Sequence, residues 1–449
     1  MIKNFYNIFK QVRFTNLVYK LVFGLIVLFI LAFIFNWIYD VAFIGLLLLL
    51  FLIVIDSIIL FRNAQPISVY RAAKYQRLSN GDINDIELII ENYYSFKIKV
   101  LIIDELPIQF QLRNFKLDTS LKSTEQKKFG YQIRPVERGE YHFGKINTFI
   151  TSPLMIMERH YKMEAPFMMP CYPSFLKLRQ YELLAISNRL SDIGVKKIRR
   201  IGHSSEFEQI KEYVLGDDIR TINWKATARR NQLMINHYRD ERAQQIYCLV
   251  DFGRIMKMPF EELTLLDYAI NATLVLGHVA WIKQDKPGLI GFNNKIATYV
   301  NADRKGNQLL RLQEALYNAK TNFEESNYET LLSTVRTKIT QRSLLMLFTN
   351  FETLSGLRRQ LKYIRKLATQ HLVVIVFFEN TELKDVLAQQ PQNTFQIYEQ
   401  TIAQKFDYEK RQIVKELQQY GILSVYTTPQ QLTVNSLNKY LEIKTRGLI

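Results

Sequence analysis

The sequence predicts a multidomain fold class: a two-helix transmembrane hairpin, then an all-β sandwich, then an α/β domain of the Rossmann-like class. Three observations predict this order. Two long apolar runs lie between residues 21 and 61, short strand-like segments follow up to residue 172, and apolar strands alternate with amphipathic helices after Gln245. The composition, 48% hydrophobic and 22% charged over 449 residues, is typical of folded protein.

The membrane segment is residues 21–61, within a predicted first region of 1–63 that includes basic flanks. The charge-free run from Leu21 to Tyr39 forms a helix of roughly 28 Å, about the thickness of a bilayer core. A second run, Val41 to Phe61, follows after Asp40 and closes a tight hairpin. Asp56 lies near the end of that run, where we expect it to reach the interface. Basic residues flank both ends: Lys3, Lys10, Arg13 and Lys20 before, and Arg62, Arg71, Lys74 and Arg77 after.

The flanking charges predict the orientation, because basic residues stay on the cytoplasmic side of a membrane. Everything after Phe61 should then be cytoplasmic, in a multi-pass protein. The net charge of +17 also raises a nucleic-acid or anionic-lipid binder as an alternative, and we favour attraction to the membrane surface as its explanation. The two cysteines, Cys171 and Cys248, form no disulfide framework, which suits a reducing compartment.

Residues 64–175 are predicted to form the sandwich. Segments such as "DIELIIENYY" and "KIKVLIID" alternate or run apolar, with turn signals between them, and this number of short strands favours an immunoglobulin-like arrangement without its disulfide. His142 and His160 stand on strand-like segments without a partnered nucleophile, so we interpret them as structural.

Residues 246–449 are predicted to form the α/β domain. Its near-continuous apolar strands, such as "IYCLVDF" and "LVVIVFF", indicate a parallel sheet covered by helices on both faces. We expect these helices near residues 259–283, 306–318, 326–340, 355–369 and 400–419, with one more at the carboxyl end. Binding sites in such domains lie at the carboxyl ends of the strands. Asp251 ends the first strand and therefore falls at that edge.

The connector, residues 176–245, contains the stretch "EYVLGDDIRTINWKATARR" at 212–230, whose acids and bases follow no helical or strand period. Gly216 turns the chain, and we expect Asp217 and Asp218 to accept hydrogen bonds from a base of this stretch while Trp224 covers the network. The same residues could equally present a partner surface. A hydrolase using Asp217 and Asp218 is a further alternative. The predicted network comprises Glu212, Tyr213, Gly216, Asp217, Asp218, Arg220, Trp224, Lys225 and Arg229.

This stretch resembles the signature of the bacterial "domain of unknown function 58" family. Upstream, "ERGEYHFGKINTFITSPL" (137–154) and "YPSF" (172–175) are similar to the same family, as is a paired amino-terminal membrane span. The resemblance implies a von Willebrand factor A-like carboxyl domain, a place in the bacterial inner (cytoplasmic) membrane, and association with MoxR-type AAA+ ATPases. The matching residues are Glu212, Tyr213, Gly216, Asp217, Arg220, Ile222, Trp224, Lys225, Ala228, Arg229, Leu233 and Glu241.

The factor A fold normally binds a divalent cation through an Asp-x-Ser-x-Ser loop, a Thr and a second Asp, because hard cations need several oxygen ligands. Here Asp251 is kept, Gly253 and Ile255 replace the serines, and Asn350 replaces the second Asp. A hydroxyl could still come from Thr321 or Ser326, and Glu352 could reach the site. We predict no intrinsic metal and no cofactor, with Asp251 capping a helix or pairing with a base.

The sequence therefore predicts a membrane-anchored, cytoplasm-facing scaffold or adaptor that binds protein partners during complex assembly or maturation, and no enzyme. The partner expected from the resemblance is a MoxR-type AAA+ ATPase. The sequence contains no Gly-x-x-x-x-Gly-Lys-Ser/Thr loop, so any ATP use would come from that partner.

Overall fold

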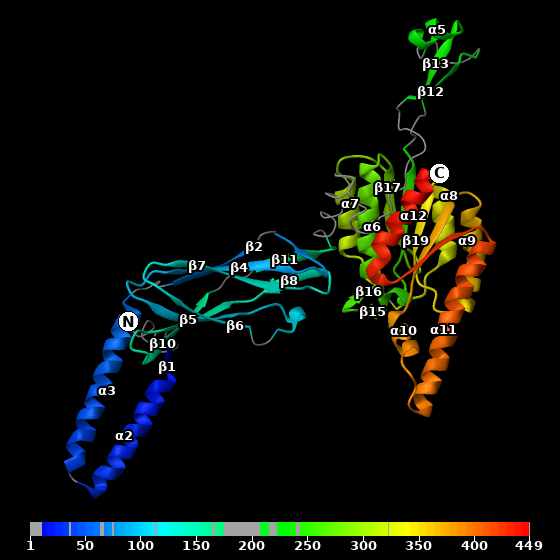
Figure 1. The fold of residues 1–449 in the computed structure, drawn as a ribbon. Coiled ribbons are helices and arrows are strands. Elements are labelled where there is room, and N and C mark those ends of the chain that lie inside the picture. The colour runs from blue at the N-terminus through cyan, green and yellow to red at the C-terminus, as the bar shows by residue number, and fades with distance from the viewer. Residues whose placement is uncertain are drawn as a thin grey trace. The chain divides into compact units, whose positions relative to one another are not determined.

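The structure is a computed structural model of the chain (Figure 1). It forms two compact units, Met1–Tyr172 and Pro173–Ile449. The described residues are 11–35, 37–62, 67–73, 76–112, 115–163, 167–174, 207–214, 222–238, 243–321 and 323–448.

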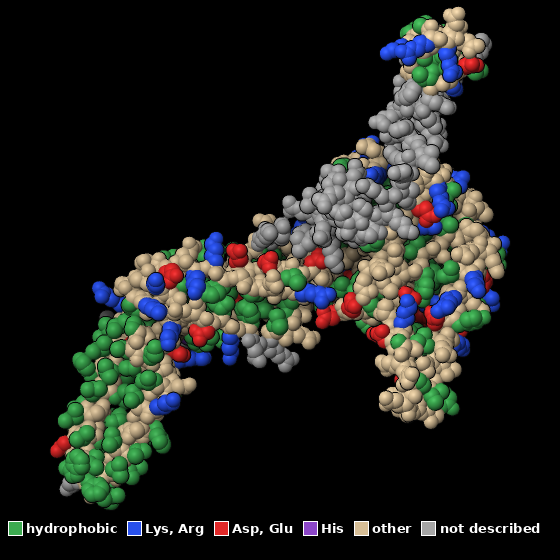
Figure 2. Space-filling view, in the orientation of Figure 1, with side chains coloured by type: hydrophobic (Ala, Val, Ile, Leu, Met, Phe, Trp, Pro, Cys, Tyr) green, Lys and Arg blue, Asp and Glu red, His purple; other side chains and the backbone are tan. Residues whose placement is uncertain are grey.

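Two apolar helices, α2 (Asn16–Ile34) and α3 (Trp37–Phe61), form the predicted hairpin near the amino terminus. Both are long and apolar enough to cross a membrane, and hydrophobic side chains cover most of the face that Figure 2 shows. A third helix in the described residues, α6 (Leu265–Ile282), also meets these criteria, but 78% of its apolar window is buried. It is therefore a core helix of the α/β domain.

The rest of the first unit is built of strands, as predicted. The strands pair antiparallel, except that β3 and β11 run parallel, in sheets ordered β1-β10-β9-β5-β6, β2-β4-β7 and β3-β11-β8. Alternation along β4 buries Ile86, Leu88 and Ile90 in a shared core with Val100 and Ile102 of β5. The immunoglobulin-like topology stays a prediction. The strands are β1 (Val12–Phe14), β2 (Ile67–Ala73), β3 (Leu78–Ser79), β4 (Asn84–Asn92), β5 (Ile98–Asp104), β6 (Lys116–Leu121), β7 (Gln126–Ile133), β8 (Gly139–Phe143), β9 (Ile146–Thr151), β10 (Met157–Met163) and β11 (Phe167–Tyr172).

The hairpin is joined to this β-rich region by polar contacts that the sequence did not reveal. Asp56 is buried and accepts hydrogen bonds from the Ser152 hydroxyl (2.7 Å) and the Met157 amide (2.9 Å). It therefore binds the turn between β9 and β10 instead of reaching a lipid interface. On the amino-terminal side, Val12–Phe14 were expected in the basic flank of the hairpin, yet they pair with β10 as an edge strand.

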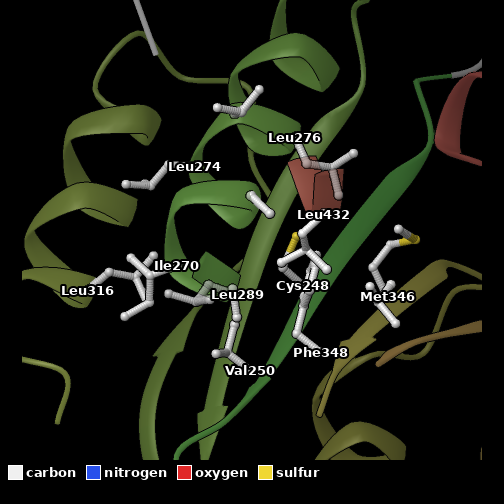
Figure 3. Close-up of a cluster of buried hydrophobic side chains, with 14 of the residues drawn as sticks. Cys248, Val250, Ile270, Leu274, Leu276, Leu289, Leu316, Met346, Phe348 and Leu432 are labelled. Carbon is white, nitrogen blue, oxygen red and sulfur yellow. The ribbon is translucent and has the colours of Figure 1, made fainter. Parts of the chain in front are cut away.

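The second unit contains a six-stranded sheet in the order β18-β17-β14-β19-β20-β21, parallel except for β18. One core packs α6, α7 and α12 against the sheet, and a second core packs α8, α9 and α11 against the opposite face. Side chains of β14, β17 and β19, including Cys248, Leu289 and Phe348, belong to the same buried cluster as Ile270 and Leu274 of α6 in the first core (Figure 3). The strands are β14 (Gln245–Asp251), β17 (Lys286–Phe292), β18 (Ile296–Val300), β19 (Leu344–Phe348), β20 (Leu372–Phe378) and β21 (Leu423–Thr427).

The helices of this domain largely match the predicted segments. They are α6, α7 (Gln308–Tyr317), α8 (Tyr328–Lys338), α9 (Leu354–Ala368), α10 (Thr381–Ala388), α11 (Thr394–Gln419) and α12 (Leu432–Thr445). A helix expected near 259 instead begins at Leu265, because β15 (Pro259–Phe260) and β16 (Leu263–Thr264) pair first and Thr264 forms a capping box with Asp267. The sequence missed α10, and α11 begins at Thr394, earlier than expected near residue 400.

Candidate functional site at the carboxyl edge of the sheet

Asp251 ends β14 at the carboxyl edge, as predicted, and is fully buried. Its Oδ1 accepts hydrogen bonds from the Gly253 amide (2.8 Å) and the Ser326 hydroxyl. Its Oδ2 accepts one from the Thr349 hydroxyl at 2.7 Å, and the Tyr328 hydroxyl lies at 3.5 Å. The hydrogen-bond donors thus come from three places in the chain: the turn after β14, the segment that leads into α8, and the residue that follows β19.

This arrangement corrects the expectation that Asp251 caps a helix or pairs with a base. The short helix after it, Arg254–Lys257, has Gly253 at its N-cap and no side-chain cap. Among the described residues, the side chains that donate hydrogen bonds to Asp251 carry hydroxyl groups and not a positive charge. Burial raises the pKa of Asp251, while the hydrogen bonds from Ser326 and Thr349 act in the opposite direction. Burial also holds the pKa of Tyr328 well above its ordinary value.

Gly253 has a steric role in this cluster. A Cβ placed there would lie 2.1 Å from the Ser326 hydroxyl oxygen and 3.0 Å from Asp251 Oδ1. A serine at position 253, as in the cation-binding pattern, could not coexist with Ser326 in its present place. In the cation-binding pattern a serine at position 253 would provide a hydroxyl group at this place. Here Ser326, from a later segment, provides that hydroxyl group, which donates a hydrogen bond to Asp251.

The remaining residues of the cation pattern do not fit a divalent cation. The Asn350 side-chain oxygen accepts a hydrogen bond from the Lys410 ammonium at 2.8 Å, so a positive charge already holds this would-be ligand. Ile255 is partly buried against the hydrophobic core. Within the described residues, no group of three His, Cys, Asp or Glu side chains could hold a metal ion.

Two pockets open at this edge on either side of the segment after β19. The first, which we call the polar pocket, has a volume of about 140 Å³. Ser326 and Tyr328 line it, so Asp251 lies behind its wall. Arg254 and Arg359 also line it, at 3.5 and 3.9 Å from Glu325, and all three side chains are largely exposed. Such exposed ion pairs contribute little stability and leave the charges available to a partner.

The second pocket, which we call the Lys410 pocket, has a volume of about 230 Å³ and a mostly apolar lining. Phe260, Phe378 and Phe406 contribute aromatic rings to it. Lys410, on α11, is buried and donates to Asn350 and, at 3.3 Å, to the Phe378 carbonyl. Burial lowers the pKa of its ammonium to about 8, although nearby Glu352 opposes the shift.

Asn350 and Glu352 line both pockets and form the ridge between them. Glu352 was considered as a ligand that could reach Asp251, and it instead faces these two openings. Lys410 was not among the residues expected at this site, although Phe406, Lys410, Ile413 and Leu417 follow helical spacing and place a lysine on the core side of α11. Because lysine is rarely buried without a partner, its place in this helical pattern could have indicated a functional position from the sequence alone.

The family signature is only partly described. Glu212 is exposed at the end of β12 (Phe207–Glu212), and the amide of Tyr213 donates to Leu233 (2.8 Å) before β13 (Met234–Tyr238). Trp224 begins the short helix α5 (Trp224–Arg230), whose Lys225 and Arg229 are exposed. Four members of the predicted network lie outside the described residues: Gly216, Asp217, Asp218 and Arg220.

Trp224 requires a correction. Its side chain is 70% exposed, so it does not cover a buried network as expected. Asn223 caps α5 and also donates to Asn236, which fixes the helix on β13 without the tryptophan. The hydrolase interpretation of Asp217 and Asp218 stays a prediction.

The part of the chain that contains the signature and most of the α/β sheet is similar to known proteins. Residues 209–416 match the family described as "Protein of unknown function DUF58". This part of the chain is therefore similar to the DUF58 family. The match includes the described signature residues from Glu212 onward, Asp251 and the residues that line the two pockets, except Pro429 of the Lys410 pocket.

An uncharacterized protein from Bacillus subtilis (strain 168), YeaD, is 28% identical over 142 residues, which are 31% of this chain and 34% of YeaD. The chain thus matches about a third of that relative's length. Among solved structures, a von Willebrand factor type A protein from Catenulispora acidiphila is 9% identical, with a TM-score of 0.28 over 48% of this chain and 44% of that one. A PapD-like domain of human CEP192 is 14% identical, with a TM-score of 0.18 over 24% of this chain and 89% of that one.

Proposed function

We propose that this protein is a membrane-anchored, non-enzymatic scaffold whose α/β domain docks protein partners at the carboxyl edge of its sheet. The observation that carries the proposal is the state of Asp251. A carboxylate whose two oxygens are engaged by Gly253, Ser326 and Thr349 is not free to act as a base, a nucleophile or a cation ligand. The edge around it still offers two pockets with mixed side chains, as a recognition surface requires.

The proposal includes three finer features. The α/β domain is von Willebrand factor A-like, with direct side-chain recognition in place of a bridging cation. The partner is a MoxR-type AAA+ ATPase, as the resemblance of the signature implies. The β-rich region and the α/β domain lie in the cytoplasm, because basic residues flank both ends of the hairpin. A carboxyl-terminal reporter that is accessible to protease outside intact bacterial cells would contradict this orientation.

The decisive experiment is affinity capture of the full-length protein from detergent-solubilised membranes, with captured proteins identified by mass spectrometry. Arg359→Glu reverses a charge in the polar pocket, and Arg342→Glu is its matched control, because Arg342 is exposed just before β19 at the opposite edge. We expect a partner, an AAA+ ATPase, that is retained by the parent and by Arg342→Glu and depleted by Arg359→Glu. The absence of any specifically enriched protein would overturn the scaffold function, and equal capture by both variants would overturn docking at this edge.

A further inference from the structure

The long helix α11 displays an apolar stripe that its own domain does not cover. Phe395, Tyr398, Ile402 and Phe406 are spaced by three, four and four residues, so they share one helix face. Their exposed fractions are 69%, 67%, 54% and 36%. Contiguous exposed hydrophobic surface of this kind on a soluble domain marks an interaction site.

The stripe leads directly into the Lys410 pocket. Phe406, its last member, is also part of the pocket lining, and Lys410 follows one turn later on α11. The projecting end of α10 and α11 is drawn mostly in hydrophobic green and uncharged tan in Figure 2. From Val386 to Phe406 the charged residues are Glu399 and Lys405. Stripe and pocket therefore form one apolar surface on a protein that is otherwise rich in charge.

Charges around the pocket specify what can approach it. Glu352, Glu379 and Glu382 line it, and Lys384 pairs with Glu379 at 2.7 Å. This acidic surround stands out on a chain with a net charge of +17. It repels anionic membranes and acidic peptides, and it attracts lysine and arginine side chains.

Lys410 adds a hydrogen-bond donor at the buried end of the pocket. Its ammonium carries three N–H donors, and its acceptors in the described part of the chain are Asn350 and the Phe378 carbonyl. The third donor is available for an acceptor atom of an occupant. An apolar pocket with one directional polar group is the usual form of a specific recognition site.

We infer that the α11 stripe and the Lys410 pocket together bind a basic amphipathic helix of a partner protein. The apolar face of that helix covers Phe395, Tyr398 and Ile402, and one large apolar side chain enters the Lys410 pocket. Flanking lysines or arginines pair with Glu352 and Glu382. This is the helix-in-groove mode of recognition, and the inference rests on the proposed scaffold function by naming its docking surface and the chemistry of the partner.

Peptide binding tests the inference on the full-length protein in detergent micelles, by fluorescence polarisation. Three labelled 16-residue probes, a length that we choose to give about four helical turns, differ in one property each. The first is an amphipathic helix with leucine and phenylalanine on one face and lysine and arginine on the other, the second replaces the basic residues by glutamate, and the third scrambles the apolar face. We expect saturable binding of the first probe and at least about tenfold weaker binding of the other two.

Variants locate the binding surface. Ile402→Ser, Glu382→Lys and Lys410→Met should each weaken binding of the first probe about fivefold to tenfold, the range expected for removal of an interface anchor. Tyr408→Ser is the matched control for the stripe, because Tyr408 is 63% exposed and lies on a different face of α11. Glu314→Lys is the control for charge, since Glu314 is exposed on α7. Both controls should bind as the parent does.

The outcomes separate this inference from the function on which it rests. Equal binding of the basic and acidic probes, or equal weakening by Tyr408→Ser and Ile402→Ser, would overturn the inference. A partner captured from membranes that is retained by Ile402→Ser and Glu382→Lys would overturn this docking surface and leave the scaffold function standing. Failure to capture any partner would overturn the scaffold function, whatever the peptides do.

Discussion

Two carboxylates in different regions of this molecule are both buried and both accept hydrogen bonds, but they differ in how many of their oxygens are hydrogen-bonded. Asp56, near the end of the second apolar helix, accepts hydrogen bonds at Oδ2 from the Ser152 hydroxyl and the Met157 amide. Its other oxygen, Oδ1, has no hydrogen-bond partner within the described residues. Asp251, at the edge of the α/β sheet, has both oxygens engaged.

The comparison shows that a carboxylate in a suggestive place is not by that fact a functional one. Asp56 suggests an intramembrane charge and Asp251 a cation site, and each instead joins segments that are distant in sequence. Asp56 attaches the hairpin to the β9–β10 turn, and Asp251 ties β14 to β19 and to the segment before α8. The greater number of donors at Asp251 predicts that its loss has the larger effect.

The largest expected effect is that of Asp251→Ala. Removal of the carboxylate leaves the Ser326 and Thr349 hydroxyls and the Gly253 amide without their acceptor, which we expect to cost about 3 kcal/mol of unfolding free energy. The measurement is urea-dependent hydrogen exchange of the β14 amides in the full-length protein. Asp385→Ala, at an exposed position on α10, is the control. Equal protection of β14 in both variants would contradict the role assigned to Asp251.

Gly253→Ala should cost about 2 kcal/mol, because its new Cβ would overlap the Ser326 hydroxyl and force the cluster apart. In a Ser326→Ala background the clash is removed, so the same substitution should cost clearly less. A double-mutant cycle on β14 protection measures the difference. Additive costs would show that Gly253 and Ser326 do not share the space that the structure assigns them.

Asp56→Ala should cost about 1 kcal/mol, a smaller amount because Ser152 and Met157 donate the two hydrogen bonds that are lost. The expected change is local: faster hydrogen exchange in the segment that contains Met157, with exchange of β14 in the other unit unchanged. Unaltered exchange at Met157 would mean that the hairpin is attached without Asp56.

The acid range offers a test of the Asp251 environment alone. Because burial raises its pKa in the folded state, the folded protein binds this proton more tightly than the unfolded chain does. The stabilisation of the folded state by this proton is fully present below the ordinary pKa of 3.8 and is lost as pH rises through the folded-state pKa. Unfolding free energies of parent and Asp251→Asn should therefore show a parent-minus-variant difference that decreases with rising pH. A difference that increases would contradict the raised pKa.

Much of the fold could be predicted, because apolar periodicity is a local signal. The hairpin helices, the strand-rich region and the parallel sheet with helices on both faces follow from it. The site could be predicted only in part, since its geometry depends on contacts between distant residues. Ser326 was a candidate hydroxyl, but nothing local indicates that Thr349 also closes Asp251 or that Lys410 holds Asn350. Trp224 was wrongly expected to be buried, because apolar residues interleaved with charged ones suggest a covered polar network. A short helix such as α5 can instead expose its apolar and its charged side chains together.

The smallest expected effect is that of Trp224→Ala, and it contrasts with both carboxylates. Because the side chain is 70% exposed, its truncation should change the unfolding free energy by less than about 0.5 kcal/mol. The capping contacts of Asn223 with Ala226 and Asn236 remain in the variant, so α5 should persist. The measurement is hydrogen exchange of 222–238 in the full-length protein, with Asn223→Ala as a comparison that should lose protection through loss of the cap. A marked loss of protection in Trp224→Ala would restore the buried network expected from the sequence. Unchanged protection would leave an exposed tryptophan on the same short helix as the exposed Arg229, and these are two of the residue types that interface hot spots favour.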